Sequence, residues 1–215
     1  EKADLKNEPE TKSIVDELKK STYVVEQVKK SERRRRPTAP FTTSTLQQEA
    51  SRRLGFGARK TMRIAQQLYE GIELDGEGTV GLITYMRTDS TTVSKQAQNE
   101  VRGFIAERYG QKMLPEEPPV YKTKSRGAQE AHEAIRPTSV WRQPEEVKRY
   151  LSREQARLYT LIWQRFVASQ MAQAVYDTMS IGVGAGLTQI EDGSWPYRLQ
   201  ATGSRVRFKG FLTVY

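Results

Sequence analysis

Cysteine is absent from this 215-residue chain, and histidine occurs only once. Without thiols the chain cannot supply a disulfide scaffold, a cysteine nucleophile, a Cys-based zinc site or an iron–sulfur cluster. With one imidazole, a zinc site would consist mostly of carboxylates, a ligand set that zinc seldom takes. A lack of thiols is compatible with a reducing cytoplasm. The chain is also long enough to bury a core without a metal or disulfide.

Long hydrophobic runs are missing as well. No apolar stretch approaches the roughly 20 residues that a membrane-spanning helix needs. The first ten residues, EKADLKNEPE, do not resemble a signal peptide. The chain does not begin with methionine, so we expect it to be a piece of a longer protein. These features predict a protein without a membrane segment.

Positive charge is in excess, with 35 Lys and Arg against 26 Asp and Glu and a net charge of +9. Such an excess favours a polyanionic partner, most often nucleic acid, although a basic domain without such a partner has the same composition. The densest run, KKSERRRR, spans residues 29–36. Runs of this kind are usually solvated. If this one touches DNA, it contacts phosphates without reading base sequence.

Hydrophobic periodicity divides the chain into strand-rich ends and a helical middle. The segment TYVVEQV at residues 22–28 and the alternation over 175–183 predict strands. Residues 44–171 are mostly helical in pattern. The sequence therefore predicts an α+β fold, in which a helical domain (44–171) is inserted into a β-rich domain (1–43 and 172–215).

Several local signals refine this division. The sequence predicts a helix near 8–20, and another that is capped at Ser44 or Thr45 and stops at Gly55. The clearest helix opens at Ser152, and its apolar stripe is more typical of a core than of a ligand site. The stripe comprises Ala156, Tyr159, Ile162, Trp163, Phe166 and Met171.

The C-terminal stretch carries two hairpin signals, Asp192-Gly193 and Gly203-Ser204. After them, Arg205, Arg207 and Lys209 alternate with less polar residues, which predicts a strand with a cationic face. That face could follow a phosphate backbone. A solvated sheet face is at least as good an interpretation.

The segment best suited to chemistry is GLITYMRTDS, residues 81–90. In an extended chain, Tyr85 and Arg87 point to the same side. Arg offers a fork of donors to phosphate oxygens and stabilises charge that builds in a transition state. A phenol beside this cation suits phosphoryl transfer, although a buried, hydrogen-bonded tyrosine is the commoner role of such a residue.

A second segment, QEAHEAIRPT at residues 129–138, contains His132, flanked by carboxylates and followed by Arg136. A single histidine is more often structural than catalytic. Because its pKa lies near neutrality, it could donate a hydrogen bond to a phosphate or transfer a proton. A Ser/His/Asp hydrolase is conceivable, but the chain has no G-x-S-x-G elbow.

Together these two segments resemble the nucleophile and histidine motifs of the bacterial type IA DNA topoisomerases. The stretches PFTTSTLQQEASRRLGFGARKTMRIAQQLYEG at 40–71 and LYTLIWQRFVASQM at 158–171 are also similar to that family. The resemblance covers essentially the whole chain and is weakest over the first thirty residues. The combined motifs are highly specific, so the resemblance outweighs the commoner interpretation of Tyr85.

The resemblance implies that Tyr85 attacks a phosphodiester of single-stranded DNA, forming a 5′-phosphotyrosyl bond and releasing a 3′-hydroxyl. Arg87 would hold the scissile phosphate, and His132 would assist through phosphate or sugar contacts or a proton relay. The supporting or DNA-contacting residues would be Thr84, Asp89, Ser90, Glu133 and Arg136. Strand passage and religation would relax negative supercoils without ATP.

The family pattern also implies partners outside this sequence. Its members carry a Toprim domain whose carboxylates bind Mg²⁺, and no such cluster occurs here. We therefore expect no metal ligand in this chain, and Mg²⁺ to be held by the Toprim domain of the same polypeptide. The chain corresponds to domain II, a β-rich arch and hinge (1–43 and 172–215), and domain III (44–171), which bears the nucleophile. A cytoplasmic, nucleoid-associated location is implied.

Two functional classes remain open on this basis. One is an enzyme fragment that holds half of a divided active site. The other is a catalytically silent module that binds single-stranded DNA or acts as a hinge when isolated from the Toprim half. A tyrosine recombinase is disfavoured, because that chemistry usually surrounds its tyrosine with several Arg and His residues. A covalent adduct between Tyr85 and DNA distinguishes the two classes.

Overall fold

The structure is a computed structural model that describes residues 4–121 and 133–215. By its internal packing the chain divides into two compact units. The sheet unit comprises 4–34 and 175–208, and the helical unit comprises 35–121, 133–174 and 209–215.

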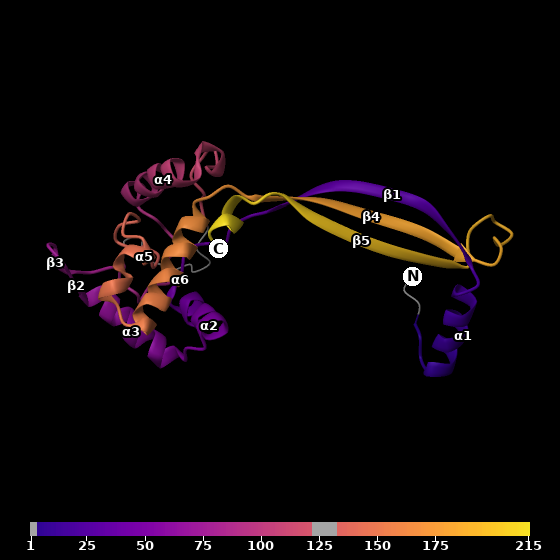
Figure 1. Cartoon of the computed structure of the whole chain (residues 1–215), viewed down its shortest axis with the longest axis horizontal. Helices are drawn as coiled ribbons and strands as arrows, with labels where there is room; N and C mark the ends of the chain where they lie inside the picture. Colours follow the sequence, from indigo (N-terminus) through magenta and orange to yellow (C-terminus); the bar gives the residue numbers. More distant parts are fainter. Residues whose placement is uncertain (1–3, 122–132) are drawn as a thin grey trace. The chain divides into compact units, whose positions relative to one another are not determined.

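The sheet unit is built on three long strands, with α1 (Glu8–Leu18) preceding them. The strands are β1 (Thr22–Arg35), β4 (Ala174–Gly186) and β5 (Tyr197–Phe208), in the order β1-β4-β5 (Figure 1). β4 and β5 pair antiparallel. Every residue of β1 is exposed, so the sheet is a single layer with two solvent-facing sides. Residues 29–35 of the Lys/Arg run lie within β1 and are solvated, as expected of such a run.

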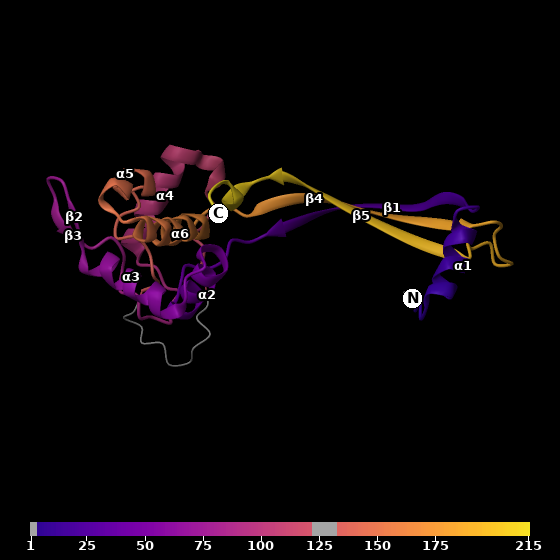
Figure 2. The ribbon, with the colours of Figure 1, turned by 60° about the horizontal axis from the view of Figure 1, so that its bottom comes forward.

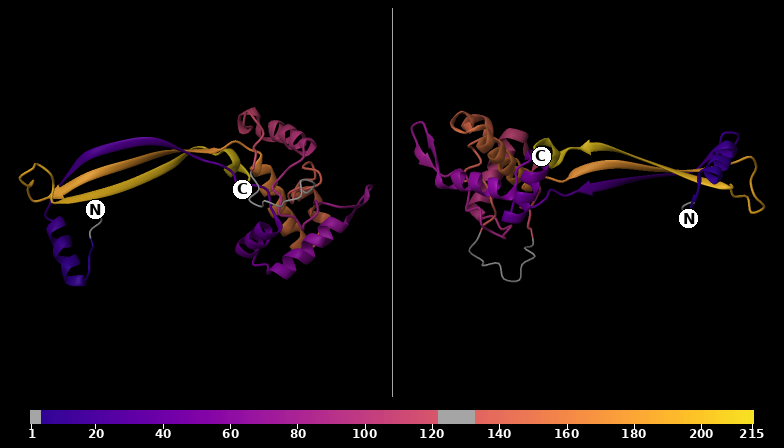
Figure 3. Two further views of the ribbon diagram at one scale, coloured as in Figure 1. Left: turned by 180° about the vertical axis from the view of Figure 1, so that it is seen from behind. Right: turned by 90° about the horizontal axis from the view of Figure 1, so that it is seen from below.

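At one end of the sheet, residues 187–196 connect β4 to β5. At Gly193 φ is +79°, and the Gly193 amide donates to the carbonyl of Ile190 at 2.8 Å, so the Asp192-Gly193 signal does mark a turn. The Gly203-Ser204 signal is wrong, because Gly203 lies inside β5 opposite Met179. Figure 3 shows α1 beside the same end of the sheet, where the Tyr197 hydroxyl donates to Glu17 at 2.8 Å.

The described part of the helical unit contains five α-helices, a short two-stranded hairpin and three 3₁₀ turns. The helices are α2 (Thr43–Leu54), α3 (Ala58–Glu70), α4 (Lys95–Tyr109), α5 (Pro144–Val147) and α6 (Arg153–Ser169), and β2 (Ile72–Leu74) pairs with β3 (Gly78–Val80). Single 3₁₀ turns occur at Gln111–Met113, Lys148–Tyr150 and Gly210–Thr213. The prediction of an α+β fold is confirmed. No helix of the described residues is long and apolar enough to cross a membrane.

α6 forms the core of the helical unit, where α2, α3 and α5 pack against it (Figure 2). Its predicted stripe is buried except for the half-buried Ala156, with Tyr159 and Ile162 fully inaccessible and Phe166 2% exposed. The polar ends of the large rings are satisfied: Tyr159 Oη donates to the Arg142 carbonyl at 2.6 Å, and Trp163 Nε1 donates to the Val140 carbonyl at 2.9 Å. Burial raises the pKa of the Tyr159 phenol well above its usual value.

The helix boundaries follow their capping signals. α6 begins with the predicted capping box between Ser152 and Gln155. α2 stops at Gly55, where φ is +71° and a side chain would be strained. Its N-cap is Thr42, two residues before the first of the expected caps, because the reciprocal cap joins Thr42 and Thr45.

The unit boundaries differ from the predicted domain boundaries in three places, the smallest of which is that residues 172–174 belong to the helical unit. Residues 35–43 belong to the helical unit, where Phe41 is fully buried and the Ala39 carbonyl accepts from Arg165 Nε at 2.7 Å. Residues 209–215 also belong there, because the Phe211 amide donates to the Ala172 carbonyl at 3.0 Å. Both segments bury aromatic rings, which the single-layer sheet has no interior to accommodate.

Candidate phosphoryl-transfer site

Residues 81–90 run between α3 and the segment 134–138. On the α3 side, the Leu82 amide donates to the Leu68 carbonyl at 2.7 Å. A Cβ at Gly81 would lie 2.7 Å from the Tyr69 carbonyl oxygen, so this close approach requires glycine. On the other side, Ile83 forms a bridge with Pro137. The segment is thus fixed along both edges just before Tyr85.

Two threonine hydroxyls fix the backbone on either side of Tyr85. Thr84 Oγ1 donates to the Ala134 carbonyl at 2.7 Å and accepts from the Arg136 amide at 3.0 Å. Thr43 Oγ1 donates to the Met86 carbonyl at 2.7 Å and accepts from the Thr88 amide at 2.9 Å. Each hydroxyl therefore joins chain segments that are more than forty residues apart.

Burial alternates along the segment from Tyr85 to Ser90. Met86, Thr88 and Ser90 are buried, with Met86 fully inaccessible. Tyr85, Arg87 and Asp89 are exposed, and Tyr85 keeps 46% of its surface in solvent. The buried side chains anchor the segment and leave a phenol, a guanidinium and a carboxylate facing solvent.

The exposed groups have few protein partners. The Tyr85 ring packs edge-on against Tyr69 of α3, with ring centroids 5.3 Å apart at 64°. Among the residues that the structure describes, no group hydrogen-bonds to the Tyr85 hydroxyl, and no carboxylate pairs with Arg87. Both side chains are therefore available to a substrate, and Tyr85 does not have the buried, satisfied role that is commoner for tyrosine.

Glu133 and Arg136 form a bidentate ion pair behind this segment. Glu133 Oε2 accepts from Arg136 Nε at 2.7 Å and Nη2 at 2.5 Å, and Oε1 accepts from the Ser94 amide at 3.0 Å. Arg136 Nη1 donates to the Pro137 carbonyl at 3.0 Å. Only 12% of the Arg136 side chain is exposed. The pair thus joins the start of α4, which Ser94 caps, to the segment that holds Thr84.

Replacing Glu133 with alanine is expected to lower the free energy of unfolding by about 1.5–3 kcal/mol, because it leaves a mostly buried guanidinium and a cap amide without their acceptor. Denaturant unfolding followed by circular dichroism measures the change. Glu145→Ala is the matched control, since its pair with Lys148 is exposed and 3.8 Å long, and we expect a change below about 0.5 kcal/mol. Equal losses in the two variants would contradict the bracing role.

The remaining predicted residues are placed as follows. Ser90 is buried, and its Oγ accepts from the Thr92 amide at 3.1 Å, while Asp89 faces solvent. His132 lies outside the described residues. Among those described, no group of three or more His, Cys, Asp or Glu side chains is placed to hold a metal ion. These residues therefore do not fit a Mg²⁺ site.

Sequence reasoning did not find Thr43 or Tyr69 as part of this site. Thr43 lies in a run of hydroxyl residues, TTST at 42–45, whose only evident signal is helix capping. The helical spacing of residues 58–69 predicts that Tyr69 lies on the core face of its helix. In the structure, 40% of Tyr69 is exposed, and its ring contacts that of Tyr85. Neither long-range contact has a local pattern that would reveal it.

Comparison with known proteins supports a single family. The family model described as DNA topoisomerase matches residues 1–215. Two curated relatives named DNA topoisomerase 1, from Xylella fastidiosa strains Temecula1 and 9a5c, are 56% identical over 188 residues, covering 87% of this chain and 22% of the relative. The structure of full-length topoisomerase I from Thermotoga maritima is 41% identical, with a TM-score of 0.79 over 97% of this chain and 32% of that protein. The chain thus spans about a fifth of the curated relatives' length.

Proposed function

We propose, from the premise that this chain belongs to the bacterial type IA DNA topoisomerase family, that Tyr85 is the nucleophile that cleaves one DNA strand. The carrying observation is that Tyr85 and Arg87 both face solvent without a described polar partner, on a backbone that Thr43 and Thr84 fix from both sides. A rigid backbone with free functional groups is the arrangement that a positioned nucleophile requires.

The proposed step is a transesterification. Tyr85 Oη forms a bond to the phosphorus while the bond from phosphorus to the 3′-oxygen breaks. The phenolic proton is lost, the 3′-oxygen gains a proton, and the DNA is held through its 5′-phosphate. Attack by the 3′-hydroxyl reverses the step and expels the tyrosine oxygen. One phosphoester replaces another each way, so resealing needs no ATP.

We assign to Arg87 the role of stabilising the negative charge on the scissile phosphate. It lies two residues from Tyr85 and faces solvent as Tyr85 does. Its guanidinium can donate to two non-bridging oxygens, and those oxygens gain negative charge in the transition state. Thr84 supports the nucleophile by fixing its backbone. The surrounding residues Ser90, Glu133 and Arg136 also support it, and Asp89, which faces solvent, can contact DNA. His132 is proposed to assist near the phosphate.

In the whole protein we propose that strand passage through the break relaxes negatively supercoiled DNA. The two units correspond to domain II and domain III of the family, with the helical unit bearing the nucleophile. Mg²⁺ would be held by the Toprim domain, since the described residues of this chain do not fit a Mg²⁺ site. DNA, preferably single-stranded, is the proposed substrate.

Labelling at opposite DNA ends tests the chemistry and its polarity. The chain is incubated with Mg²⁺ and a single-stranded oligonucleotide, with and without a polypeptide carrying the Toprim domain, and resolved on a denaturing gel. We expect the 3′-label to migrate with protein and the 5′-label to appear as a shorter free strand ending in a 3′-hydroxyl. The reverse distribution would contradict the proposed polarity.

The same gel separates the two functional classes. An adduct that forms only when the Toprim polypeptide is added means that the chain alone is a silent binding or hinge module. An adduct without that polypeptide means that the chain holds a complete cleavage site. No adduct under either condition would overturn the assignment of Tyr85.

A further inference from the structure

The two faces of the three-stranded sheet differ in their chemistry. Thr178 lies opposite Ser204, and the hydroxyls of Thr178 and Ser31 are 2.7 Å apart, so these three residues share one face. Strand alternation then places Lys29 and Arg33 on that face as well. We call it the hydroxyl face, comprising Lys29, Ser31, Arg33, Tyr176, Thr178, Ser180, Gln200, Thr202 and Ser204.

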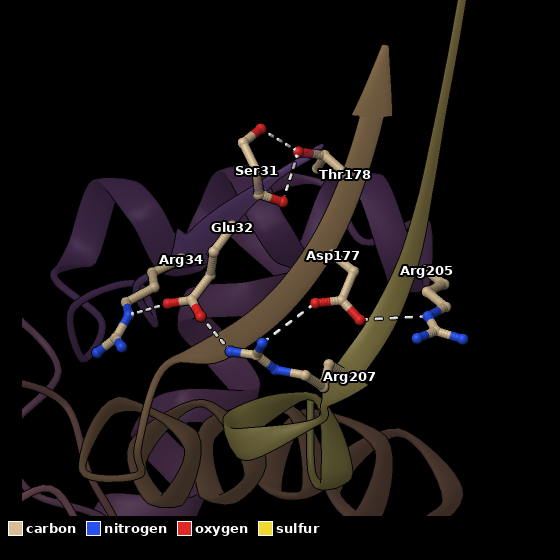
Figure 4. A network of polar contacts seen from close by, with 7 residues as sticks. All are labelled: Ser31, Glu32, Arg34, Asp177, Thr178, Arg205 and Arg207. Carbon is tan, nitrogen blue, oxygen red and sulfur yellow. Dashed lines mark hydrogen bonds and ion pairs between the residues drawn. The ribbon is translucent and has the colours of Figure 1, made fainter. Parts of the chain in front are cut away.

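By the same alternation, Glu32 and Asp177 belong to the opposite face. Figure 4 shows how these two carboxylates engage the arginines there. Glu32 pairs with Arg34 and Arg207. Asp177 pairs with Arg205 and Arg207, and each of these two contacts of Asp177 is 3.2 Å long. Hydrogen bonds from Arg34 and Arg207 hold the pKa of Glu32 below its usual value. The predicted cationic face at 205–207 is therefore neutralised by its neighbours.

Lys29 and Arg33 have no such partners in the part of the chain that the structure describes, whereas Arg198, which alternation places on the hydroxyl face, pairs with Glu26 at 3.5 Å. Among the described residues, no carboxylate pairs with Lys29 or Arg33, and Arg33 instead lies over the Tyr176 ring at 5.2 Å. A shallow groove of about 300 Å³ runs between the strands here. It is lined by Lys29, Ser31, Arg33, Thr178, Met179, Ser180, Thr202, Gly203 and Ser204.

We infer that the hydroxyl face binds the sugar–phosphate backbone of a DNA duplex, at a site separate in sequence from the Tyr85 segment. Lys, Arg, Ser and Thr are the side chains that contact phosphates without reading bases. Lys29 and Arg33 are four residues apart, about 13 Å along a strand, which spans about four phosphates of one duplex strand. No aromatic side chain lines this groove among the described residues, and the Tyr176 ring is covered by Arg33, so the groove offers no ring for stacking on single-stranded bases.

This inference rests on the proposed function, in that DNA is the substrate, but it is tested separately. Binding of the full chain to a blunt 30-base-pair duplex is measured by fluorescence anisotropy over a range of salt concentrations. In the double variant Lys29→Ala/Arg33→Ala we expect the slope of log K against log salt to fall by about 2, with at least tenfold weaker binding at 100 mM salt. Adduct formation on a short single strand should stay unchanged.

The control is Lys30→Ala/Arg34→Ala, which removes the same charges, at the same spacing, from the same strand on the opposite face. We expect its salt slope to change by less than about 0.5, because Arg34 already pairs with Glu32. All four positions are exposed, so neither variant should unfold the sheet.

Equal losses in the two double variants would overturn the inference, since only overall charge would then matter. So would the absence of duplex binding at low salt, or a loss confined to single-stranded DNA. If the unmodified chain formed no adduct even with the Toprim polypeptide but still bound duplex, that result would count against the role of Tyr85 and leave the hydroxyl face supported.

Discussion

Replacing Tyr85 with phenylalanine is expected to reduce the covalent DNA adduct to background. The variant lacks the only oxygen that the proposed step places on phosphorus, while its ring keeps the edge contact with Tyr69. Because the side chain is 46% exposed and the described residues make no hydrogen bond to its hydroxyl, the free energy of unfolding should change by less than about 0.5 kcal/mol. The labelled-oligonucleotide gel measures the adduct, and denaturant unfolding checks the fold.

Tyr69→Phe is the matched control for this variant. Tyr69 is comparably exposed, its ring centroid is 5.3 Å from that of Tyr85, and it loses the same atom. We expect its adduct to form at nearly the normal rate. Loss of the adduct in Tyr69→Phe with survival in Tyr85→Phe would transfer the nucleophile to α3 and refute the assignment.

Replacing Arg87 with alanine is expected to slow adduct formation by about 10²–10³-fold, the usual effect of removing one donor to a developing oxyanion. The rate of adduct formation in Arg87→Lys should lie between those of the unmodified chain and Arg87→Ala, because an ammonium keeps the charge but loses the bidentate fork. Single-turnover rates at saturating DNA separate this effect from weaker binding.

Arg59→Ala controls for charge in the Arg87 experiment. Arg59 lies in α3, is exposed, and forms no ion pair among the residues described. We expect a change in rate of less than about threefold. Comparable slowing in the Arg59 and Arg87 variants would mean that both act through the general field of the protein and that Arg87 does not hold the phosphate.

Local signals account for the parts of the fold that were predicted well. The α6 stripe repeats at helical spacing and its capping box is contiguous, so its core face and its start both follow from sequence. The Gly203-Ser204 signal failed because a glycine inside a long strand has the same local sequence as one in a turn, and pairing with Met179 decides between them. Tertiary pairing outweighs turn propensity there.

The candidate site shows the same division between local and distant information. The exposure of Tyr85 and Arg87 follows from alternation along an extended segment, which a sequence can suggest. The clamps by Thr43 and Thr84 cannot be read locally, since each hydroxyl meets a backbone more than forty residues away. The neutralisation of Arg205 and Arg207 likewise depends on carboxylates from two other strands.

The interrupted sheet constrains the order in which this chain can fold. β4 and β5 are joined by a short connection and can pair early, whereas β1 meets β4 only across the intervening residues 36–173. Closing that loop in a disordered chain costs about 4 kcal/mol of chain entropy, which one exposed strand pairing does little to offset. Once the inserted unit has folded, its ends are already fixed and this cost disappears. We therefore expect β1 to dock last, so that refolding of the sheet follows the kinetics of the helical unit.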